Sequence, residues 1–361
     1  MPQTPPPAAA LLLALAAALG VGAAVVPAAR AQTPDPAPRP AATPAPSPPP
    51  ATDPSDPVAT VDGMERLSGA HPGLRRSGAK GVCAAGEFVA SGAGARLTTA
   101  PLFQPGARTP VVARFSNGGG NPRAPDNAAA TRGLSLSFGP PGAEAMEMVM
   151  INAPAFTANT AEGFAALLDS RAPDPATGRP DAARVAAADA AHPEYAVQPR
   201  YLRETPPPAS YATAPYFSVN SFVFVDASGT RRHARWTFEP VAGRVGLSPE
   251  ERAARGADFL QDELRARVAA APAEWRMMVV LPREGVDPLL DATAIWPEAE
   301  RERVEVGTLR VASVSPAGEP GACQAHMFNP VLLPEGIEPS DDPILALRAP
   351  TYAVSLSRRQ N

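Results

Sequence analysis

The feature that most constrains the fold is a series of short segments in the middle of the chain in which apolar and polar residues alternate. Such alternation is typical of β-strands with one buried face. Gly, Pro, Asn and Asp separate the segments, and most neighbours follow one another without a helical pattern between them. The pattern favours an antiparallel barrel or sandwich over a parallel sheet, and we expect a barrel. The predicted strands are 111–116, 134–138, 145–152, 222–226, 233–241, 275–281 and 308–314.

Helical patterns lie outside these segments. Ser248-Pro249-Glu250-Glu251 combines an N-cap residue, a proline at the first helical position and a capping-box glutamate, which predicts a helix that runs to Ala271. Shorter helices are expected at 161–168 and 180–191. Ser340-Asp341-Asp342-Pro343 is a start signal for a C-terminal helix. A barrel with such flanking helices belongs to the α+β fold class.

The first 57 residues differ from the rest in composition. Residues 8–26 form an apolar run that Ala29-Arg30-Ala31 follows, which predicts a secretory signal peptide over 1–31. Because residues 1–7 contain no Lys or Arg, an uncleaved membrane anchor is the alternative. Residues 32–57 are dominated by Pro, Ala, Thr, Ser and Asp and predict a disordered linker. We therefore expect an exported protein, periplasmic or extracellular, with one domain over 58–361 and no later membrane span.

Charge and cysteine content narrow the possible partners and cross-links. The net charge of -4 provides no basic surface of the kind that nucleic acid or anionic lipid requires. Cys83 and Cys323 are the two cysteines, and in an oxidising compartment they could form a disulfide. Two buried thiols are the alternative, since the sequence does not determine the distance between their Cα atoms.

Arg348 and Tyr352, four residues apart near the C-terminus, form the first pair with a chemical implication. On a helix this spacing puts the guanidinium beside the phenol, and a permanent positive charge favours the phenolate. A tyrosinate can ligate ferric haem, although a packed tyrosine on an amphipathic end helix has the same pattern. Pro350 lies between the two and predicts either a kink or a restart of the helix.

Several blocks of sequence extend this observation over the whole region from Val58 to Arg359. They are His71-Pro-Gly-Leu-Arg75, Ala79-Lys-Gly81, Val112-Ala-Arg-Phe-Ser-Asn-Gly-Gly-Gly-Asn-Pro122, Arg132-Gly-Leu134, Asn152-Ala-Pro-Ala-Phe156, Trp296-Pro297, Phe328-Asn-Pro330 and Asp342-Pro-Ile-Leu345. Together they resemble the catalase superfamily and, more closely, its small bacterial catalase-related peroxidases. The resemblance implies a catalase-like antiparallel barrel with a C-terminal haem-ligating helix, haem b as cofactor, and reduction of peroxides, organic ones included, by an external electron donor.

The resemblance also implies roles for individual residues. Tyr352 would ligate the haem iron with Arg348 as its charge partner. Arg75 and Arg114 would contact the haem propionates, because arginine binds a carboxylate through two hydrogen bonds and keeps its charge. Asn152 would donate a hydrogen bond to peroxide on the distal side, which is the side of the haem opposite the tyrosine.

Neighbouring residues would complete the cavity. Phe156 and Phe115 would line it, although either could equally belong to the barrel core, and Ser116 would orient a distal imidazole. Met146, Met148 and Met150 alternate on one strand and are expected on one face, in the barrel core or as a sulfur lining for a cofactor.

The chain departs from the family pattern at Gly78, which occupies the position of the distal histidine, between Arg75 and Ala79-Lys80-Gly81. An imidazole moves a proton from the near to the far peroxide oxygen, and glycine has no group for this. His71 is an alternative base. We expect a peroxidase with impaired catalase activity. The alternatives are a haem-binding protein of the cell envelope without meaningful turnover, and a barrel that has lost haem and binds an apolar ligand.

Overall fold

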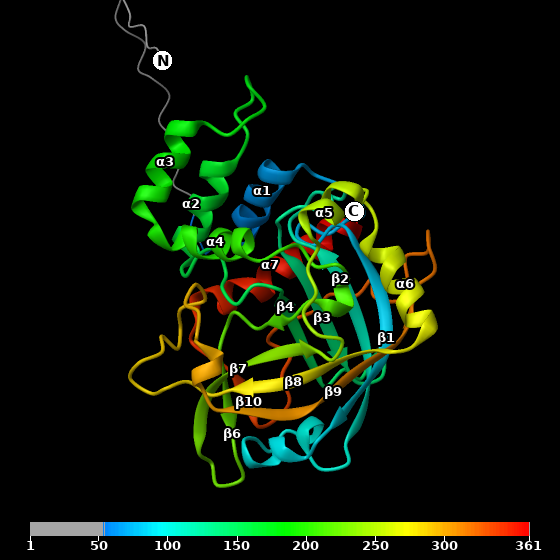
Figure 1. Ribbon diagram of the computed structural model, residues 1–361. Helices are drawn as coiled ribbons and strands as arrows, with labels where there is room; N and C mark the ends of the chain where they lie inside the picture. Colours follow the sequence, from blue (N-terminus) through cyan, green and yellow to red (C-terminus); the bar gives the residue numbers. More distant parts are fainter. Residues whose placement is uncertain (1–52, 54, 361) are drawn as a thin grey trace, which may run out of the picture. The chain divides into compact units, whose positions relative to one another are not determined.

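The fold is built around an antiparallel sheet with the strand order β10-β6-β7-β5-β4-β3-β2-β1-β9-β8, shown for the computed structural model in Figure 1. β7 also pairs with β8, so the strands from β7 to β8 close into a barrel to which β6 and β10 are added. The structure describes residues 53 and 55–360. The predicted signal peptide and most of the predicted linker therefore lie outside the described residues.

Every segment in which alternation predicted a strand overlaps an observed strand, and four of the segments, 145–152, 222–226, 233–241 and 275–281, extend one residue beyond it. β1, β5 and β10 are additional, and the predicted antiparallel pairing is confirmed. The bounds are β1 Gly81–Ala90, β2 Arg108–Asn117, β3 Arg132–Phe138, β4 Met146–Ile151, β5 Tyr216–Phe217, β6 Phe222–Val225, β7 Arg231–Pro240, β8 Ala273–Val280, β9 Arg303–Val314 and β10 Ile337–Pro339.

The barrel interior is packed with large apolar side chains. Phe115 on β2 is fully buried, and its ring lies 5.5 Å from those of both Tyr211 and Trp275. Phe115 therefore belongs to the core, as do Met146, Met148 and Met150. Because successive side chains of a strand point to opposite faces, Arg114 and Ser116 point to the outside of the barrel.

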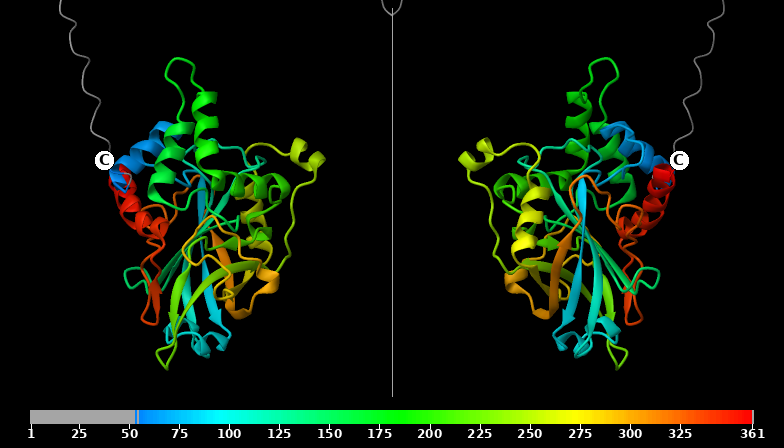
Figure 2. Two further views of the ribbon diagram at one scale, coloured as in Figure 1. Left: turned by 90° about the vertical axis from the view of Figure 1, so that its left-hand side faces the viewer. Right: turned by 90° about the vertical axis from the view of Figure 1, so that its right-hand side faces the viewer.

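Helices cover parts of the barrel. α1, α2 and α7 contact one another, and Figure 2 shows α1 beside α7, with α6 on the opposite side of the barrel. α1 begins at Pro57 with Asp56 as its N-cap. The helix bounds are α1 Pro57–Ser68, α2 Ala161–Arg171, α3 Ala182–Ala191, α4 Val197–Glu204, α5 Pro249–Ala254, α6 Leu260–Ala270 and α7 Pro343–Gln360. None of the helices in the described residues is both long and apolar enough to span a membrane.

The single helix predicted from Ser248 to Ala271 is wrong, because α5 and α6 are separate helices. The predicted capping box at Ser248 is present. The chain leaves the helix after Ala254, and the buried Asp126 carboxylate accepts the backbone N–H groups of Phe259 and Leu260, at 2.8 Å each, to begin α6. A residue distant in sequence thus sets the second start.

Two points that the sequence left open are resolved by the structure. α7 continues through Pro350, so the helix does not restart there. Cys83 and Cys323 form a disulfide with their Cα atoms 5.5 Å apart, which links β1 to a loop that precedes β10.

Candidate functional site

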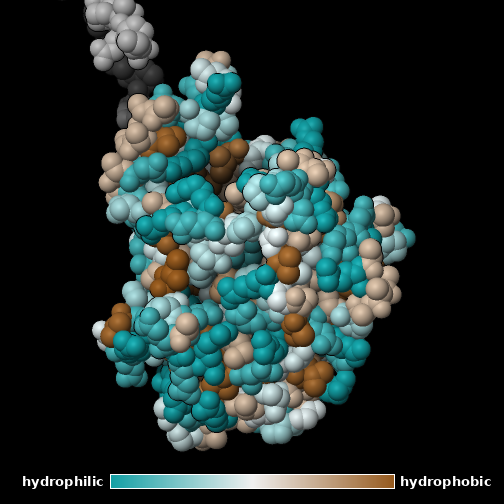
Figure 3. All heavy atoms as spheres, in the orientation of Figure 1, coloured by the Kyte–Doolittle hydropathy of each residue, from teal (hydrophilic) through white to brown (hydrophobic). Residues whose placement is uncertain are grey.

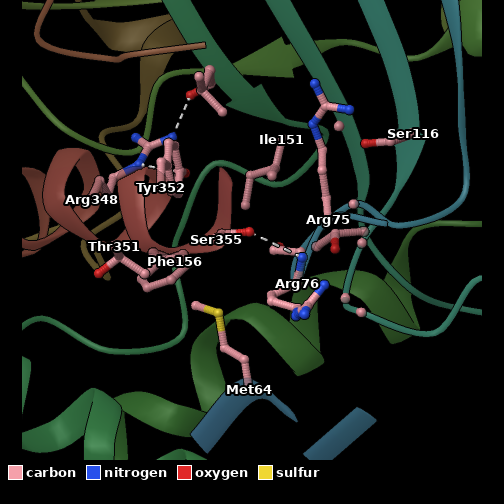
Figure 4. Close-up of a pocket in the computed structure, with 18 of the residues that line it drawn as sticks. Met64, Arg75, Arg76, Ser116, Ile151, Phe156, Arg348, Thr351, Tyr352 and Ser355 are labelled. Atoms are coloured by element: carbon pink, nitrogen blue, oxygen red, sulfur yellow. Dashed lines mark hydrogen bonds between the residues drawn. The ribbon is translucent and has the colours of Figure 1, made fainter. Parts of the chain in front are cut away.

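A cavity of about 390 Å³ lies between the outer face of β2–β4 and the helices α1, α2 and α7 (Figure 4). Hydrophilic residues cover most of the face shown in Figure 3, whereas the cavity is mostly apolar. Its volume is in the range of cofactor-binding pockets, roughly 300–1,000 Å³. The apolar lining includes Met64, Leu67, Val149, Ile151, Phe156, Phe164, Leu167, Leu168 and Phe328.

Tyr352 and Arg348 lie on one wall of the cavity, on consecutive turns of α7 (Figure 4). Arg348 Nε donates a hydrogen bond to the Tyr352 phenol oxygen at 3.1 Å. The other two guanidinium nitrogens donate to Asn220 Oδ1 at 2.6 Å and to the Val149 carbonyl at 2.9 Å. The hydrogen bond holds the phenol oxygen at the cavity wall, where the arrangement can supply an oxygen ligand to a bound metal centre.

The fully buried carboxylate of Asp342 is connected to the Arg348–Tyr352 pair through Asn220. Asn220 Nδ2 donates to Asp342 Oδ2 at 2.8 Å, and Asp342 Oδ1 accepts the backbone N–H of Ile344 at the start of α7. Burial raises the pKa of Asp342, although these hydrogen bonds oppose the rise. The chain of hydrogen bonds from Asp342 through Asn220 to Arg348 orients the guanidinium toward Tyr352.

Three arginines at the cavity, Arg75, Arg114 and Arg359, form a cluster that has no counter-ion among the described residues. In the described part of the chain their hydrogen bonds go to neutral groups, and the buried Nε atoms of Arg114 and Arg359 have no partner. Burial, followed by the charges of Arg114 and Arg359, lowers the pKa of Arg75 to about 8. Burial, with a smaller effect of Arg359, lowers the pKa of Arg114 to about 10. Because uncompensated buried charge is costly, the cluster is suited to bind carboxylates.

Gly78 lies at the cavity with φ +67°, a left-handed conformation that favours glycine. A Cβ at this position would lie 3.0 Å from Ser116 Oγ and 3.4 Å from Arg114 Nη1. The side chain of residue 78 would therefore start beside the serine, as expected for an imidazole that Ser116 orients. His71 bonds through Nε2 to the Ser68 carbonyl at 3.0 Å and does not line the cavity.

Asn152 is buried next to the cavity and does not line it. Its Oδ1 accepts the backbone N–H of Arg132 at 2.7 Å, in the pair formed by β3 and β4. The Nδ2 group is thus the part of this amide that remains available as a donor. Phe156 does line the cavity, with its ring 5.4 Å from that of Phe164 on α2.

The structure thus brings seven of the eight predicted site residues to one cavity, with Asn152 directly behind it. Sequence reasoning did not assign Asn220 or Arg359. Asn220 follows β5 in a segment that resembles an ordinary turn, so it gives no local signal. Arg359 lies seven residues after Tyr352, two turns along the same helix face, and this spacing was the signal that could have identified it.

Comparison with known sequences places the chain in one family. Residues 63–360 match the family model described as catalase. The chain is 38% identical over 304 residues to the catalase-related peroxidase of Synechococcus elongatus. This match covers 84% of this chain and 88% of the relative. It is 32% identical over 306 residues to the catalase-related peroxidase of Mycolicibacterium paratuberculosis, and this match covers 84% of this chain and 94% of the relative. The catalase of Vibrio cholerae is 29% identical over 286 residues, and the chain spans 56% of its length.

Solved structures show the same fold. A bacterial catalase superposes with a TM-score of 0.70 at 24% identity, over 79% of this chain and 57% of that one. Catalase A from Saccharomyces cerevisiae gives a TM-score of 0.71 at 21% identity, and the match covers 79% of this chain and 61% of that one. The chain therefore spans about three fifths of these structures, and the predicted catalase-like α+β barrel is confirmed. By its family match and its sequence relatives, the chain belongs to the catalase family.

Proposed function

We propose that the protein is an exported haem b peroxidase that reduces peroxides, organic ones included, with electrons from an external small-molecule donor. The observation that carries the proposal is one cavity that holds Tyr352 paired with Arg348 and a cluster of arginines without a counter-ion in the part of the chain that the structure describes. The names of the two catalase-related peroxidases support the same reaction class.

The residues present fit haem. Tyr352 would ligate the iron, and Arg75, Arg114 and Arg359 would bind the two propionate carboxylates. The apolar residues of α1, α2 and β4 would contact the porphyrin faces. When bound, the haem iron supplies a centre that binds peroxide and passes electrons to it.

The reaction reduces the peroxide ROOH with two electrons and two protons to ROH and water. The O–O bond breaks, and the donor is oxidised. In this chain, Asn152, which lies next to the cavity and does not line it, would have to reach the bound peroxide with Nδ2, since its Oδ1 is already occupied. Proton transfer would pass through water held by Ser116 Oγ next to Gly78, because no imidazole is present at that position.

Gly78 also supports a second candidate, a haem-binding protein of the cell envelope without meaningful turnover. Such a protein keeps the phenol, its arginine and the arginine cluster, and has no need for a base. The two candidates therefore differ in turnover and agree in haem uptake.

Export rests on the sequence pattern of residues 1–31 and on the disulfide. Disulfides persist in oxidising compartments such as the periplasm and the extracellular space, and the Cys83–Cys323 link supports that location.

Purified protein loaded with haem tests the proposal, with cumene hydroperoxide or H₂O₂ as substrate and an oxidisable dye as donor. We expect dye oxidation with both peroxides and little oxygen release from H₂O₂. Haem uptake without dye oxidation would favour the binding protein, and absence of haem uptake would refute both candidates.

A further inference from the structure

The loop of residues 321–329, which we call the carbonyl loop, orients two of the three arginines of this cluster. Arg75 Nη2 donates to the carbonyls of Cys323 at 2.9 Å and His326 at 2.6 Å. Arg359 Nη1 donates to the carbonyl of Gln324 at 2.8 Å. The loop also contributes the Phe328 ring to the cavity wall, 5.9 Å from the Arg75 guanidinium. These contacts connect the loop to the proposed carboxylate-binding groups.

Carbonyl partners orient an arginine without neutralising it. A carboxylate partner would form an ion pair and remove the attraction for an incoming anion, whereas a carbonyl oxygen carries only a partial charge. Arg75 and Arg359 therefore keep a net positive charge while several of their N–H groups are held in place. Their position depends on the position of the carbonyl loop, which has neither helical nor strand structure.

The Cys83–Cys323 disulfide is the first of two anchors for the carbonyl loop. Cys83 lies on β1 directly opposite Arg114 on β2, so the covalent link attaches the loop to the strand that pairs with the one carrying the third arginine. The loop packs closely there, because a Cβ on Gly321 would lie 2.6 Å from Cys83 Cβ. Cys323 itself supplies one of the carbonyls that bind Arg75.

The second anchor is a buried carboxylate on β4. Glu147 is only 1% exposed, and its Oε1 is bonded to His326 Nε2. Its Oε2 accepts the backbone N–H of Asn329 at 2.5 Å. The loop is thus held at Cys323 by a covalent bond and at 326–329 by hydrogen bonds.

We propose that the Cys83–Cys323 disulfide, together with the Glu147–His326 pair, positions Arg75 and Arg359 to bind the cofactor carboxylates, so that reduction of the disulfide weakens cofactor retention. The inference rests on the proposed function, because it takes the propionates as the anions that the cluster binds. Cys83, Cys323, Glu147 and His326 are positioning residues that act through the arginines. The disulfide then couples the redox state of the compartment to cofactor loading.

Reduction requires an external dithiol. The S–S bond of Cys83–Cys323 accepts two electrons and two protons to give two thiols, and the dithiol is oxidised to its own disulfide. The loop then keeps only its hydrogen-bonded anchor. Because the two cysteines are separated by 240 residues in the sequence, no nearby covalent connection holds Cys323 beside β1 once the bond is reduced.

The test compares iron-free protoporphyrin IX with its dimethyl ester by fluorescence titration, which needs neither iron nor turnover. Two forms of the full chain without the disulfide are compared with the untreated wild type: the double variant Cys83→Ser with Cys323→Ser, and the wild type treated with a dithiol. We expect the free diacid to bind about ten- to hundredfold more weakly to both forms, as for the loss of one or two hydrogen bonds to a charged group. Binding of the dimethyl ester should change less than twofold, because it has no carboxylate for the arginines.

Histidine variants test the second anchor without touching the disulfide. His326→Ala is expected to weaken diacid binding selectively, and His326→Gln, which retains a donor toward Glu147, to restore most of it. Equal weakening of diacid and ester would show that the anchors are merely structural and overturn the inference. Unchanged diacid binding in all variants would overturn it as well, whereas a wild type that binds no porphyrin would refute the proposed function itself.

Discussion

Substitution of Gly78 by histidine, with Gly78→Ala as a matched control, separates the chemistry of an imidazole from the strain of the backbone. Gly78 has φ +67°, and a Cβ there would lie 3.0 Å from Ser116 Oγ. A residue with a side chain in this conformation costs about 1–3 kcal/mol. Both variants add a Cβ, so we expect both to lower the thermal unfolding midpoint by a similar amount.

The two variants differ in proton transfer. A positioned general acid–base contributes about 10²- to 10⁴-fold to the rate, and only histidine supplies one. We therefore expect Gly78→His to release oxygen from H₂O₂ at least about tenfold faster than Gly78→Ala, even if strain displaces the imidazole from its best position.

The assay is an oxygen electrode with each rate normalised to bound haem, and the unfolding midpoints are recorded on the same preparations. Equal oxygen release from the two haem-loaded variants, at matched midpoints, would refute the placement of residue 78 on the distal side of the cavity.

Three further substitutions test other parts of the account. Arg114→Met removes a buried cation that has no counter-ion, so the cofactor-free protein should gain about 1–4 kcal/mol of unfolding free energy while protoporphyrin IX binds more weakly; a loss of stability in urea denaturation would contradict this. Burial raises the pKa of Asp126, but hydrogen bonds from Lys80, Leu260, Asn117 and Phe259 together outweigh this effect. The pKa of Asp126 therefore lies below its usual value. Asp126 also forms an ion pair with Lys80, with Nζ and Oδ1 2.6 Å apart. Asp126→Asn should therefore cost about 3–5 kcal/mol near neutral pH, and the deficit should shrink as the pH falls through the acid range and the wild-type carboxylate is protonated; a deficit independent of pH in urea denaturation would argue against this ion pair. Asn220→Ala removes one hydrogen-bond partner from Arg348 and one from the buried Asp342 and should cost about 1–3 kcal/mol in calorimetry; no change would mean that the chain of hydrogen bonds behind Tyr352 is not formed.

The fold could be predicted where one face of a strand carries large apolar residues. β1 was missed because its middle, Ala84-Ala85-Gly86, has only small side chains and no clear alternation. The structure gives the reason, since a Cβ on Gly86 would lie 1.9 Å from the Arg310 carbonyl, where β1 and β9 shift register. Close contact between two backbones thus selects small residues and removes the signal that identifies other strands.

The candidate site could be predicted where its chemistry is local in the sequence or lies in blocks with a family resemblance. The pair Arg348 and Tyr352 is a local pattern, and its geometry is as expected. Asn220 contacts Arg348 across 128 residues, and the carbonyls that hold Arg75 are about 250 residues away from it. Such partners are backbone groups or common polar residues, and only tertiary structure brings them together.

Haem titration of the wild type and of Tyr352→Phe, followed by absorption spectroscopy, tests the central claim that this cavity holds haem through Tyr352. We predict that the wild type binds one haem per chain with the ferric spectrum of a phenolate ligand. Tyr352→Phe should lose that spectrum while still binding iron-free protoporphyrin IX through the arginine cluster. Identical ferric spectra for the two proteins would contradict the account.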